Sequence, residues 1–463
     1  MVLSAGKAGQ PRKRQETSTH AQPSNQKPGL ATRQAATRLL GAVIDRAISL
    51  DGLLEPENGN ATYRALPPAD QSLVRAILLT ALRNLPVLDA AIDAMVDRKL
   101  PDGARSLRHI LIVAATQILF LDIPDRAAVD LAVEQTHADP RSRRFANLAN
   151  AVLRRLSREG QAVLEQVKDQ AAGGPAWLVD MLQSHYGKEH ARRILDAHRF
   201  APPLDLTVKS DAAGWAERLG GIVVATGSVR LRAAHGAIAE LEGFDEGAWW
   251  VQDAAASIPA RLFGDIEGLA VADLCAAPGG KTAQLAAGGG KVTAFDLSAN
   301  RLRRLGENMD RLGLKVETIV GDFRKTAGNR TFDAVLLDTP CSSTGTIRRH
   351  PDVPWTKSAE DVAKLASLQA DLLDAAIGLV KSGGKLVFAN CSLDPSEGET
   401  LVKACLAKRD DVELVAVDPT DWPGLEEAIT KEGFFRTTPA MMQGDTPETS
   451  GLDGFFAAIL RRR

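Results

Sequence analysis

Hydrophobic residues recur at three- and four-residue spacing through the first third of the chain. The clearest cases are residues 31–48 and 71–96, where one face of a helix would be apolar along its whole length. Prolines stand where such helices would end, at positions 67, 68, 101, 124 and 140. The pattern predicts an all-α domain over residues 31–160.

The pattern changes in the second half of the chain, where short apolar runs alternate with amphipathic stretches. The runs are residues 269–274, 291–296, 316–320, 333–338, 385–390, 412–417 and 454–460. Strands that alternate with helices predict an α/β domain over residues 263–463, built on a mostly parallel sheet with helices on both faces. Ligands of such sheets bind at the carboxyl ends of the strands.

Two further segments complete the predicted organisation. Residues 161–262 mix helical stretches with alternating runs at 204–209 and 228–233, which predicts a small α+β connecting unit. Residues 1–30 are rich in Lys, Arg, Gln, Ser and Pro and show no periodicity. We therefore expect a disordered basic tail at this end of the chain.

Composition and charge exclude several classes of protein. Hydrophobic residues make up 44% and charged residues 25% of the 463 positions, which is typical of a globular chain. No signal-peptide core follows the basic start, and the longest apolar stretch, residues 110–121, is too short to span a bilayer. We expect a soluble, cytoplasmic protein with no membrane contact. The formal net charge is only −2, so any surface that binds nucleic acid must be local.

One predicted helix, at residues 141–160, carries a strong excess of positive charge. It contains six arginines and a single acid, Glu159. A charge run on a helix is most often a solvated face, but this bias in sign suits phosphate binding equally well, so both interpretations stay open. The arginines are Arg141, Arg143, Arg144, Arg154, Arg155 and Arg158.

A glycine-containing loop follows the strand predicted at 269–274. It consists of Cys275, Ala276, Ala277, Pro278, Gly279, Gly280 and Lys281. Its glycines let a ligand approach the backbone at a helix N-terminus. The loop is one residue from a phosphate-binding P-loop, because Cys275 stands where that loop needs its first glycine.

Acidic residues at three strand ends help to decide whether the loop binds a phosphate or a nucleoside. Asp296 ends the strand after the loop, where an acid suits the hydroxyls of a ribose. Together with Asp322 and Asp338 it would repel phosphates unless a metal intervened. A neutral or cationic nucleoside therefore fits better than a triphosphate. A P-loop NTPase, with Asp338 on its metal-binding strand, remains the alternative.

Two of the four cysteines directly follow predicted strands. Cys341 comes after the strand at 333–338, and Cys391 after the strand at 385–390. A lone cysteine is usually inert core, but two cysteines at neighbouring strand ends are expected to share one pocket with Asp338. Cys405 lies within a predicted helix and is expected to pack there. The cysteines form no CxxC pair, so we expect no metal requirement.

Four motifs together resemble the NOL1/NOP2/Sun family. They are DLCAAPGGKT at 273–282, DTPCSSTGTIRRHPD at 338–352, NCS at 390–392 with PSEGE after it, and DGFFAAIL at 453–460. The helical N-terminal domain is similar to the RNA-binding fold of NusB, which favours the Sun/Fmu branch. Members of this family are RNA cytosine-5 methyltransferases that use S-adenosyl-L-methionine. The resemblance implies a Rossmann-like methyltransferase sheet and an RNA substrate, with 16S ribosomal RNA expected and transfer RNA as the alternative.

The resemblance also implies where the cofactor would bind. Residues 275–281 would hold its methionine part and ribose, and Asp296 would bind the ribose hydroxyls. Asp322 would border the adenine, and Asp338 would lie beside both the methyl donor and the target base. The chain departs from the family's more usual LRVN in the connecting unit, where it has LTVK at 206–209.

The same resemblance assigns the catalytic cysteines. Cys391 would be the nucleophile and Cys341 would help to release the product, although the swapped assignment remains open. The family's usual DAPC and TCS are DTPC and NCS here, which leaves both thiols in place. Carbon 5 of cytosine is a weak nucleophile, and addition of a thiolate to carbon 6 activates it. Asp338 would share a proton at ring N3.

Access to the target base sets a further requirement. A base inside a duplex cannot reach such a pocket, so the target must be unpaired or flipped out. A non-catalytic RNA-binding protein is the remaining alternative function. Besides the helix at 141–160, the candidates for contacts to the RNA backbone are Arg301, Arg303, Arg304, Arg348 and Arg349.

Overall fold

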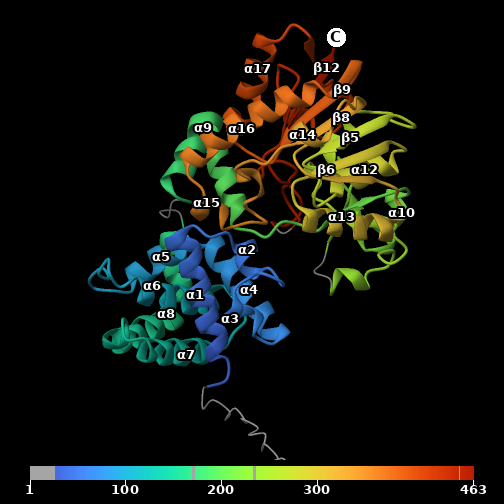
Figure 1. Cartoon of the computed structure of the whole chain (residues 1–463). Coiled ribbons are helices and arrows are strands. Elements are labelled where there is room, and N and C mark those ends of the chain that lie inside the picture. Colours follow the sequence, from blue (N-terminus) through green and yellow to red (C-terminus); the bar gives the residue numbers. More distant parts are fainter. Residues whose placement is uncertain (1–26, 169–172, 233–235, 448) are drawn as a thin grey trace, which may run out of the picture.

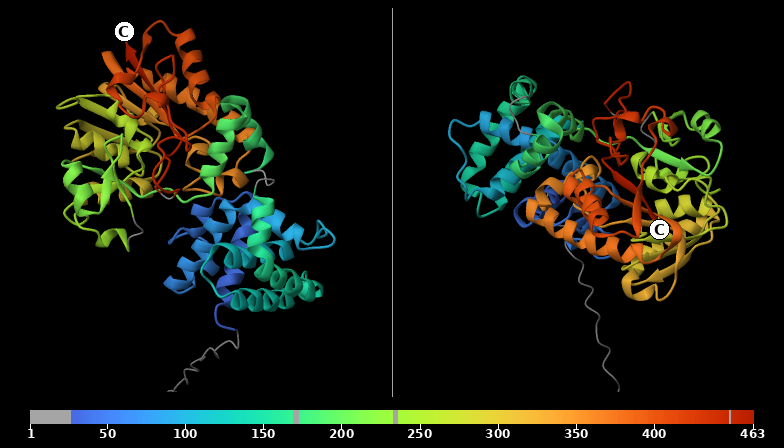
Figure 2. Two further views of the ribbon diagram at one scale, coloured as in Figure 1. Left: turned by 180° about the vertical axis from the view of Figure 1, so that it is seen from behind. Right: turned by 90° about the horizontal axis from the view of Figure 1, so that it is seen from above.

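The computed structural model describes residues 27–168, 173–232, 236–447 and 449–463. Most of the expected basic tail, residues 1–26, lies outside this range. Lys27, from the same predicted tail, forms an ion pair with Glu134 at 2.7 Å. Figure 1 shows a helical domain at the N-terminal end of the chain and a sheet domain beyond it, and the two views in Figure 2 show the helical domain on one side of the sheet domain.

The expected all-α domain is present. Its apolar faces meet in one core, with α6 buried on most sides. Pro68 opens α4, where a missing N–H costs nothing, and Pro124 directly precedes α7. The helices are α1 (Leu30–Arg46), α2 (Leu50–Leu54), α3 (Ala61–Arg64), α4 (Pro68–Arg83), α5 (Leu85–Ala94), α6 (Arg105–Phe120), α7 (Asp125–Ala138), η1 (Arg143–Phe145) and α8 (Ala146–Val167).

The apolar stretch at residues 110–121 forms most of α6 and packs in this core. Across the part of the chain that the structure describes, no helix is both long and apolar enough to cross a membrane.

A connecting unit follows, with a four-stranded antiparallel sheet in the order β2-β3-β1-β4. The strands expected at 204–209 and 228–233 are β1 and β3, whereas β2 and β4 were not expected from the sequence. The bidentate pair of Arg230 and Asp205 is buried beneath it. The elements are α9 (Ala176–His198), β1 (Asp205–Val208), α10 (Ala212–Arg218), β2 (Gly221–Val223), β3 (Val229–Leu231), η2 (Ile238–Glu240) and β4 (Trp249–Val251).

The second sheet has the order β10-β12-β9-β8-β5-β6-β7, with β11 paired to β12. Strands β5 to β9 run parallel to one another, and β12 is antiparallel to β9 and to β10. All seven predicted runs contribute strands. These are β5 (Ala270–Leu274), β6 (Lys291–Asp296), β7 (Glu317–Val320), β8 (Phe332–Asp338), β9 (Val380–Asn390), β10 (Val412–Val415), β11 (Phe435–Arg436) and β12 (Phe456–Arg462).

Helices cover both faces of this sheet, so its central strands are apolar on both sides. In β8, Leu336 packs in the core beneath α11 and α12, while Val335 and Leu337 pack in the core beneath α14, α16 and α17. The elements are η3 (Ala255–Ser257), α11 (Ile258–Arg261), α12 (Gly280–Ala287), α13 (Ala299–Leu312), α14 (Phe323–Thr326), η4 (Thr344–Thr346), α15 (Val353–Thr356), α16 (Ala359–Ile377), η5 (Pro395–Glu397), α17 (Glu399–Lys408), η6 (Pro419–Asp421) and η7 (Glu426–Ala428).

The strand order determines where a ligand can bind. The chain goes from β5 outward to β6 and β7, then returns to the other side of β5 as β8 and β9. Loops diverge at such a switch point and leave a crevice at the carboxyl ends of the strands. The motifs singled out in the sequence, at 273–282, 338–352 and 390–399, all begin at the ends of strands at this edge.

Candidate active site

The loops after β8 and β9 bring two cysteines together. Cys341 follows the end of β8, and Cys391 is the first residue after β9. Because β8 and β9 are adjacent parallel strands, their carboxyl ends lie side by side. The two Sγ atoms are 3.4 Å apart. The hydroxyl of Ser343 lies 3.6 Å from the sulfur of Cys391 and 4.0 Å from that of Cys341.

A buried carboxylate, that of Glu397, holds the two cysteine loops against each other. It accepts hydrogen bonds from the N–H (2.9 Å) and the hydroxyl (2.5 Å) of Ser342, next to Cys341. Gln369 donates a third bond at 2.7 Å. The backbone carbonyl of Glu397 accepts from Asn390, the last residue of β9, at 2.6 Å. With 0% exposure, Glu397 ties the loop after β8 to the end of β9.

Further bonds join the same two loops directly. The hydroxyl of Thr344 accepts a hydrogen bond from Leu393 N–H at 2.8 Å. The N–H of Gly345 donates to the carbonyl of Cys391 at 2.8 Å. A Cβ at Gly345 would lie 2.0 Å from the carbonyl oxygen of Gly454, so this close approach requires glycine.

The hydrogen bond between the thiols separates their pKa values. It lowers the pKa of Cys391 below that of an ordinary thiol, although burial acts in the opposite direction. The same bond, together with burial, raises the pKa of Cys341. Because the thiolate is the nucleophilic form, Cys391 is the better nucleophile of the two.

Lys281 and Asp338 form an ion pair near Cys391. Lys281 Nζ lies 2.7 Å from Asp338 Oδ2 and 4.7 Å from the centre of the Phe455 ring. Burial lowers the pKa of Lys281, but the carboxylate of Asp338 and its hydrogen bond outweigh this, and the net shift is upward. Lys281 therefore stays charged, and its charge favours the thiolate of Cys391 while that of Asp338 opposes it.

The glycine-containing loop, residues 275–281, turns from β5 into α12. Cys275 and Gly279 adopt left-handed backbone conformations, with φ of 62° and 105°. The N–H of Ala277 donates to the carboxylate of Asp296 at 3.2 Å, which ties the loop to the end of β6. Burial raises the pKa of Cys275 to about 12, so this thiol is inert and the residue contributes its backbone.

Three carboxylates surround this loop: Asp273, Asp296 and Asp338. Asp273 is fully buried; its Oδ2 accepts from Thr282 at 2.6 Å, and its Oδ1 has no partner within the described chain. Burial raises the pKa of Asp273 to about 7, and the other two carboxylates add to the shift. Such a concentration of buried acid favours a cationic ligand over an anionic one.

Asp322 stands apart from these carboxylates. It caps the N-terminus of α14 and forms an ion pair with Arg324 at 2.6 Å. The hydrogen bond from Arg324 lowers the pKa of Asp322. Asp322 lies after β7, which pairs with β6, so it reaches the same edge of the sheet with its carboxylate already engaged.

The arginines expected to contact RNA beside this site also have partners within the protein. Arg349 is held between Asp253 (2.5 Å) and Asp453 (2.7 Å), and both Nη atoms of Arg348 donate to backbone carbonyls. Arg301 reaches Asp296 at 3.6 Å. Arg303 and Arg304 pair across to Glu57 and Glu55 of the helical domain. The side chains of Arg301, Arg303 and Arg304 remain about half exposed in these pairs, so their contact with RNA stays a prediction.

Three features of the site escaped the sequence analysis. Glu397 and Asp273 stood within quoted motifs without any assigned role, and the pairing of Lys281 with Asp338 was not foreseen. The one sequence signal for any of them was the acid at position 397, in the segment PSEGE that follows Cys391. No group of three or more His, Cys, Asp or Glu residues is placed to hold a metal ion in the described ranges of the chain.

Loss of the Cys341 thiol should raise the pKa of Cys391, since its hydrogen bond is the main cause that lowers it. Alkylation of Cys391 by iodoacetamide, measured by peptide mass spectrometry over a range of pH, reports the pKa of this thiol. We expect the pH at which the alkylation rate is half-maximal to be higher in Cys341→Ala than in the wild type. Cys405→Ala, which removes a thiol in α17, should leave the midpoint unchanged. A midpoint in Cys341→Ala at or below the wild-type value would contradict the account.

The Glu397→Gln substitution tests whether the carboxylate holds the loops. An amide accepts hydrogen bonds only through its oxygen. One of the buried donors that now bond to the two carboxylate oxygens, those of Ser342 and Gln369, therefore loses its acceptor. We expect the free energy of unfolding to fall by roughly 1–3 kcal/mol. Glu360→Gln, at an exposed position of α16, should change it by less than about 0.5 kcal/mol. Equal stability of both variants in urea denaturation would refute this role.

Comparison with known proteins gives two family matches. Residues 265–461 match the family described as 16S rRNA methyltransferase RsmB/F, and residues 13–158 match the NusB family. The chain is 35% identical over 446 residues to the ribosomal RNA small subunit methyltransferase B of Vibrio vulnificus, covering 92% of this chain and 98% of that protein.

Solved structures share the fold. The crystal structure of PH0851 matches with a TM-score of 0.68 at 22% identity, over 94% of this chain and 99% of that one. A methyltransferase homolog from Pyrococcus horikoshii matches with a TM-score of 0.51 at 29% identity, over 61% of this chain and 94% of that one. The resemblance and the fold class expected from the sequence are thus confirmed. The chain belongs to the 16S rRNA methyltransferase RsmB/F family and carries a NusB-family domain ahead of its methyltransferase domain.

Proposed function

We propose that this protein transfers a methyl group from S-adenosylmethionine to carbon 5 of a cytosine in 16S ribosomal RNA. The observation that carries the proposal is the pair of cysteines at 3.4 Å, with the pKa of Cys391 lowered and a charged Lys281–Asp338 pair beside it. Family membership supports methyl transfer to ribosomal RNA and replaces the alternative of a P-loop NTPase.

The charges around the loop after β5 suit the cofactor. S-adenosylmethionine carries a cationic sulfonium and an ammonium group, and it supplies an electrophilic methyl group when bound. Asp273, with its unpartnered buried oxygen, and the nearby Asp296 and Asp338 form an acidic setting for such a ligand. Residues 275–281 would hold the methionine part and the ribose, Asp296 the ribose hydroxyls, and Asp322 the edge of the adenine.

Covalent catalysis begins with Cys391. Its thiolate adds to carbon 6 of the cytosine, so that electron density moves through the ring and carbon 5 becomes nucleophilic. Asp338 is held by Lys281 through Oδ2, which leaves Oδ1 to share a proton, taken up from solvent as the thiolate adds, with ring N3. After methyl transfer, carbon 5 loses its proton to a base, the bond between carbon 6 and sulfur breaks, and the thiolate of Cys391 leaves.

Cys341 is assigned to the release step. With its raised pKa it is a protonated thiol that donates a hydrogen bond to the sulfur of Cys391. This bond stabilises Cys391 as a thiolate, both before attack and as the leaving group. The swapped assignment would require the thiol of higher pKa to attack, which makes it the weaker alternative.

The helical domain would bind the RNA. The six arginines from Arg141 to Arg158 are all exposed, and among these residues only Arg155 forms an ion pair, with Glu159. Exposed guanidinium groups of one sign along η1 and α8 suit the phosphate backbone of RNA. Recognition would then depend strongly on salt concentration.

The test is methyl transfer from labelled S-adenosylmethionine to unmodified 16S ribosomal RNA and, separately, to transfer RNA, followed by nucleoside analysis. We expect label in 5-methylcytidine of 16S RNA, a loss of roughly a thousandfold or more in Cys391→Ala, and RNA retained covalently by Cys341→Ala. Cys405→Ala is the matched control and should keep wild-type activity.

Other outcomes would overturn specific parts of the proposal. Label confined to transfer RNA would replace the substrate, and label in another nucleoside would replace the chemistry. Activity that survives in Cys391→Ala would refute the nucleophile. No transfer to either RNA would favour the non-catalytic RNA-binding alternative.

A further inference from the structure

The helical domain meets the methyltransferase domain through a polar junction next to the Cys341 loop. Arg83, at the end of α4, donates to the carbonyl of Arg348 at 2.7 Å. Leu50 N–H donates to the carboxylate of Asp352 at 2.9 Å, and the indole of Trp355 donates to the carbonyl of Leu82 at 3.3 Å. Figure 1 shows α15 at this boundary, above the helical domain.

A hollow of about 480 Å³ opens at this junction. Its lining comes from α2 and α4 on one side and from residues 348–352 on the other, with Ala201 and Pro202 between them. Arg75 lies exposed at the hollow, Arg83 is half-buried in it, and Arg348, at 1% exposure, closes its inner end.

Arg83 and Arg348 place two guanidinium groups close enough for the charge of Arg348 to act on Arg83. Neither forms an ion pair with a carboxylate among the described residues, although the charges of Asp453 and Asp253 act on Arg348. Each has a buried Nε without a hydrogen-bond partner there. Burial lowers the pKa of Arg83 to about 10, and the charge of Arg348 lowers it further. Arg83 is therefore a half-buried charge with no acid among the described residues to balance it, and a bound anion would supply that balance.

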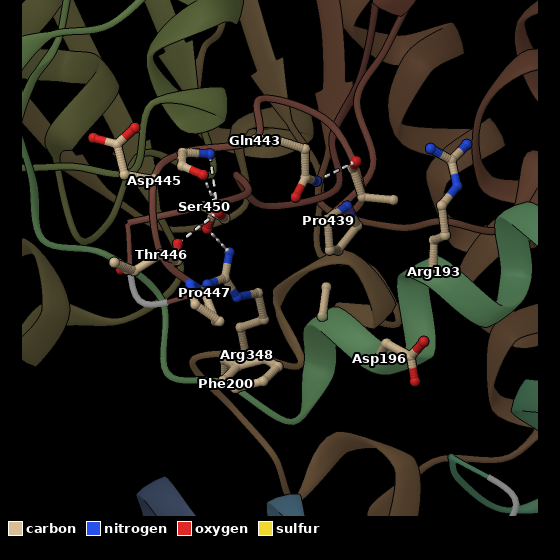
Figure 3. Close-up of a pocket in the computed structure, with 13 residues that line it drawn as sticks. Arg193, Asp196, Phe200, Arg348, Pro439, Gln443, Asp445, Thr446, Pro447 and Ser450 are labelled. Carbon is tan, nitrogen blue, oxygen red and sulfur yellow. Dashed lines mark hydrogen bonds between the residues drawn. The ribbon is translucent and has the colours of Figure 1, made fainter. Parts of the chain in front are cut away.

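His198 and a second hollow lie on the far side of Arg348. Burial lowers the pKa of His198 to about 3, Arg348 adds to the shift, and neither ring nitrogen has a partner within the described chain. Figure 3 shows Arg348 at the edge of that hollow, a cavity of about 550 Å³ between α9 and residues 439–450, where it donates to the carbonyl of Ser450. Carbonyl oxygens hold Arg348 in place there but carry no full negative charge.

Two acids also line the hollow, and each has a partner. Asp51 pairs with His350 at 3.0 Å and lies within reach of the charge of Arg75, and Asp352 accepts the N–H of Leu50. Arg349, which also lines the hollow, is neutralised by its two buried carboxylates outside it. The charge of Arg83, with the exposed Arg75 on the same helix, is therefore the one left for a ligand.

We propose that this hollow binds a phosphate group of the RNA strand that carries the target cytosine. Arg75 and Arg83 would donate hydrogen bonds to the phosphate, and the buried Arg348 would add mainly its charge. The inference rests on the proposed function, since it requires an RNA substrate.

The chain connects this hollow to the candidate active site. Residues 344–352 begin beside the cysteines, where Gly345 N–H donates to the carbonyl of Cys391, and end in the wall of the hollow at Asp352. A phosphate bound there would fix the RNA strand relative to both domains and to the thiols. The hollow is thus a positioning site for the substrate and takes no part in the chemistry.

The test measures binding of a 16S RNA fragment to Arg83→Gln and Arg75→Gln over a range of salt concentrations. Losing one phosphate contact should weaken binding by roughly fivefold to tenfold near physiological salt, and it should lower the slope of log affinity against log salt by about 0.7. The kcat for methyl transfer should stay unchanged while KM for RNA rises. Arg83→Lys should recover part of the affinity because it keeps the charge.

Controls separate the site from the fold and from the proposed function. Arg461→Gln, in a pair with Glu413 at the opposite end of the sheet, should bind RNA like the wild type. Arg75 is exposed, so Arg75→Gln decides the matter if Arg83→Gln fails to fold. A wild-type protein that methylates no RNA would refute the proposed function. A wild type that methylates RNA, with variants of unchanged affinity and salt slope, would refute only the phosphate site.

A free anion is the remaining possible occupant. If inorganic phosphate raised the melting temperature of the wild type but not that of Arg83→Gln, and RNA affinity were the same in both, the hollow would be a small-anion site. That result would overturn the assignment to RNA.

Discussion

The contact between the loops after β8 and β9 is built around one buried residue, Glu397. Parallel pairing brings the strand ends together, but it does not determine how their loops approach. Glu397 bonds to Ser342 on one loop and to Asn390 at the start of the other, so that the cysteines beside these residues stand at 3.4 Å. The different pKa values of the thiols follow from this distance, and the proposed division into an attacking and a releasing group rests on that difference.

Charge organises the rest of the site around the same loops. Buried acids surround the glycine-containing loop, which suits a cationic methyl donor, while Lys281 offsets one of them at the point nearest Cys391. Farther out, at the domain junction, Arg83 has no acidic partner among the described residues. We propose that the molecule presents negative charge to a cationic cofactor and positive charge to an anionic substrate on two sides of the loop that carries Cys341.

Much of this could be predicted from the sequence, because strand and helix periodicity is local. The runs before Cys275, Cys341 and Cys391 showed that all three residues stand at strand ends, and the acids at 296 and 338 followed by the same argument. What could not be predicted depends on contacts distant in sequence. Glu397 acts on a residue 55 positions away, and Arg349 was taken for a surface group because its two carboxylates, at 253 and 453, are far along the chain.

The most direct test of the central claim is to identify which cysteine forms the bond to RNA. A 16S RNA transcribed with 5-fluorocytidine in place of cytidine cannot lose a proton from carbon 5, so the adduct should persist after methyl transfer. Digestion of the trapped complex and mass spectrometry would then locate the nucleotide. The account predicts attachment at Cys391; attachment at Cys341 would contradict it.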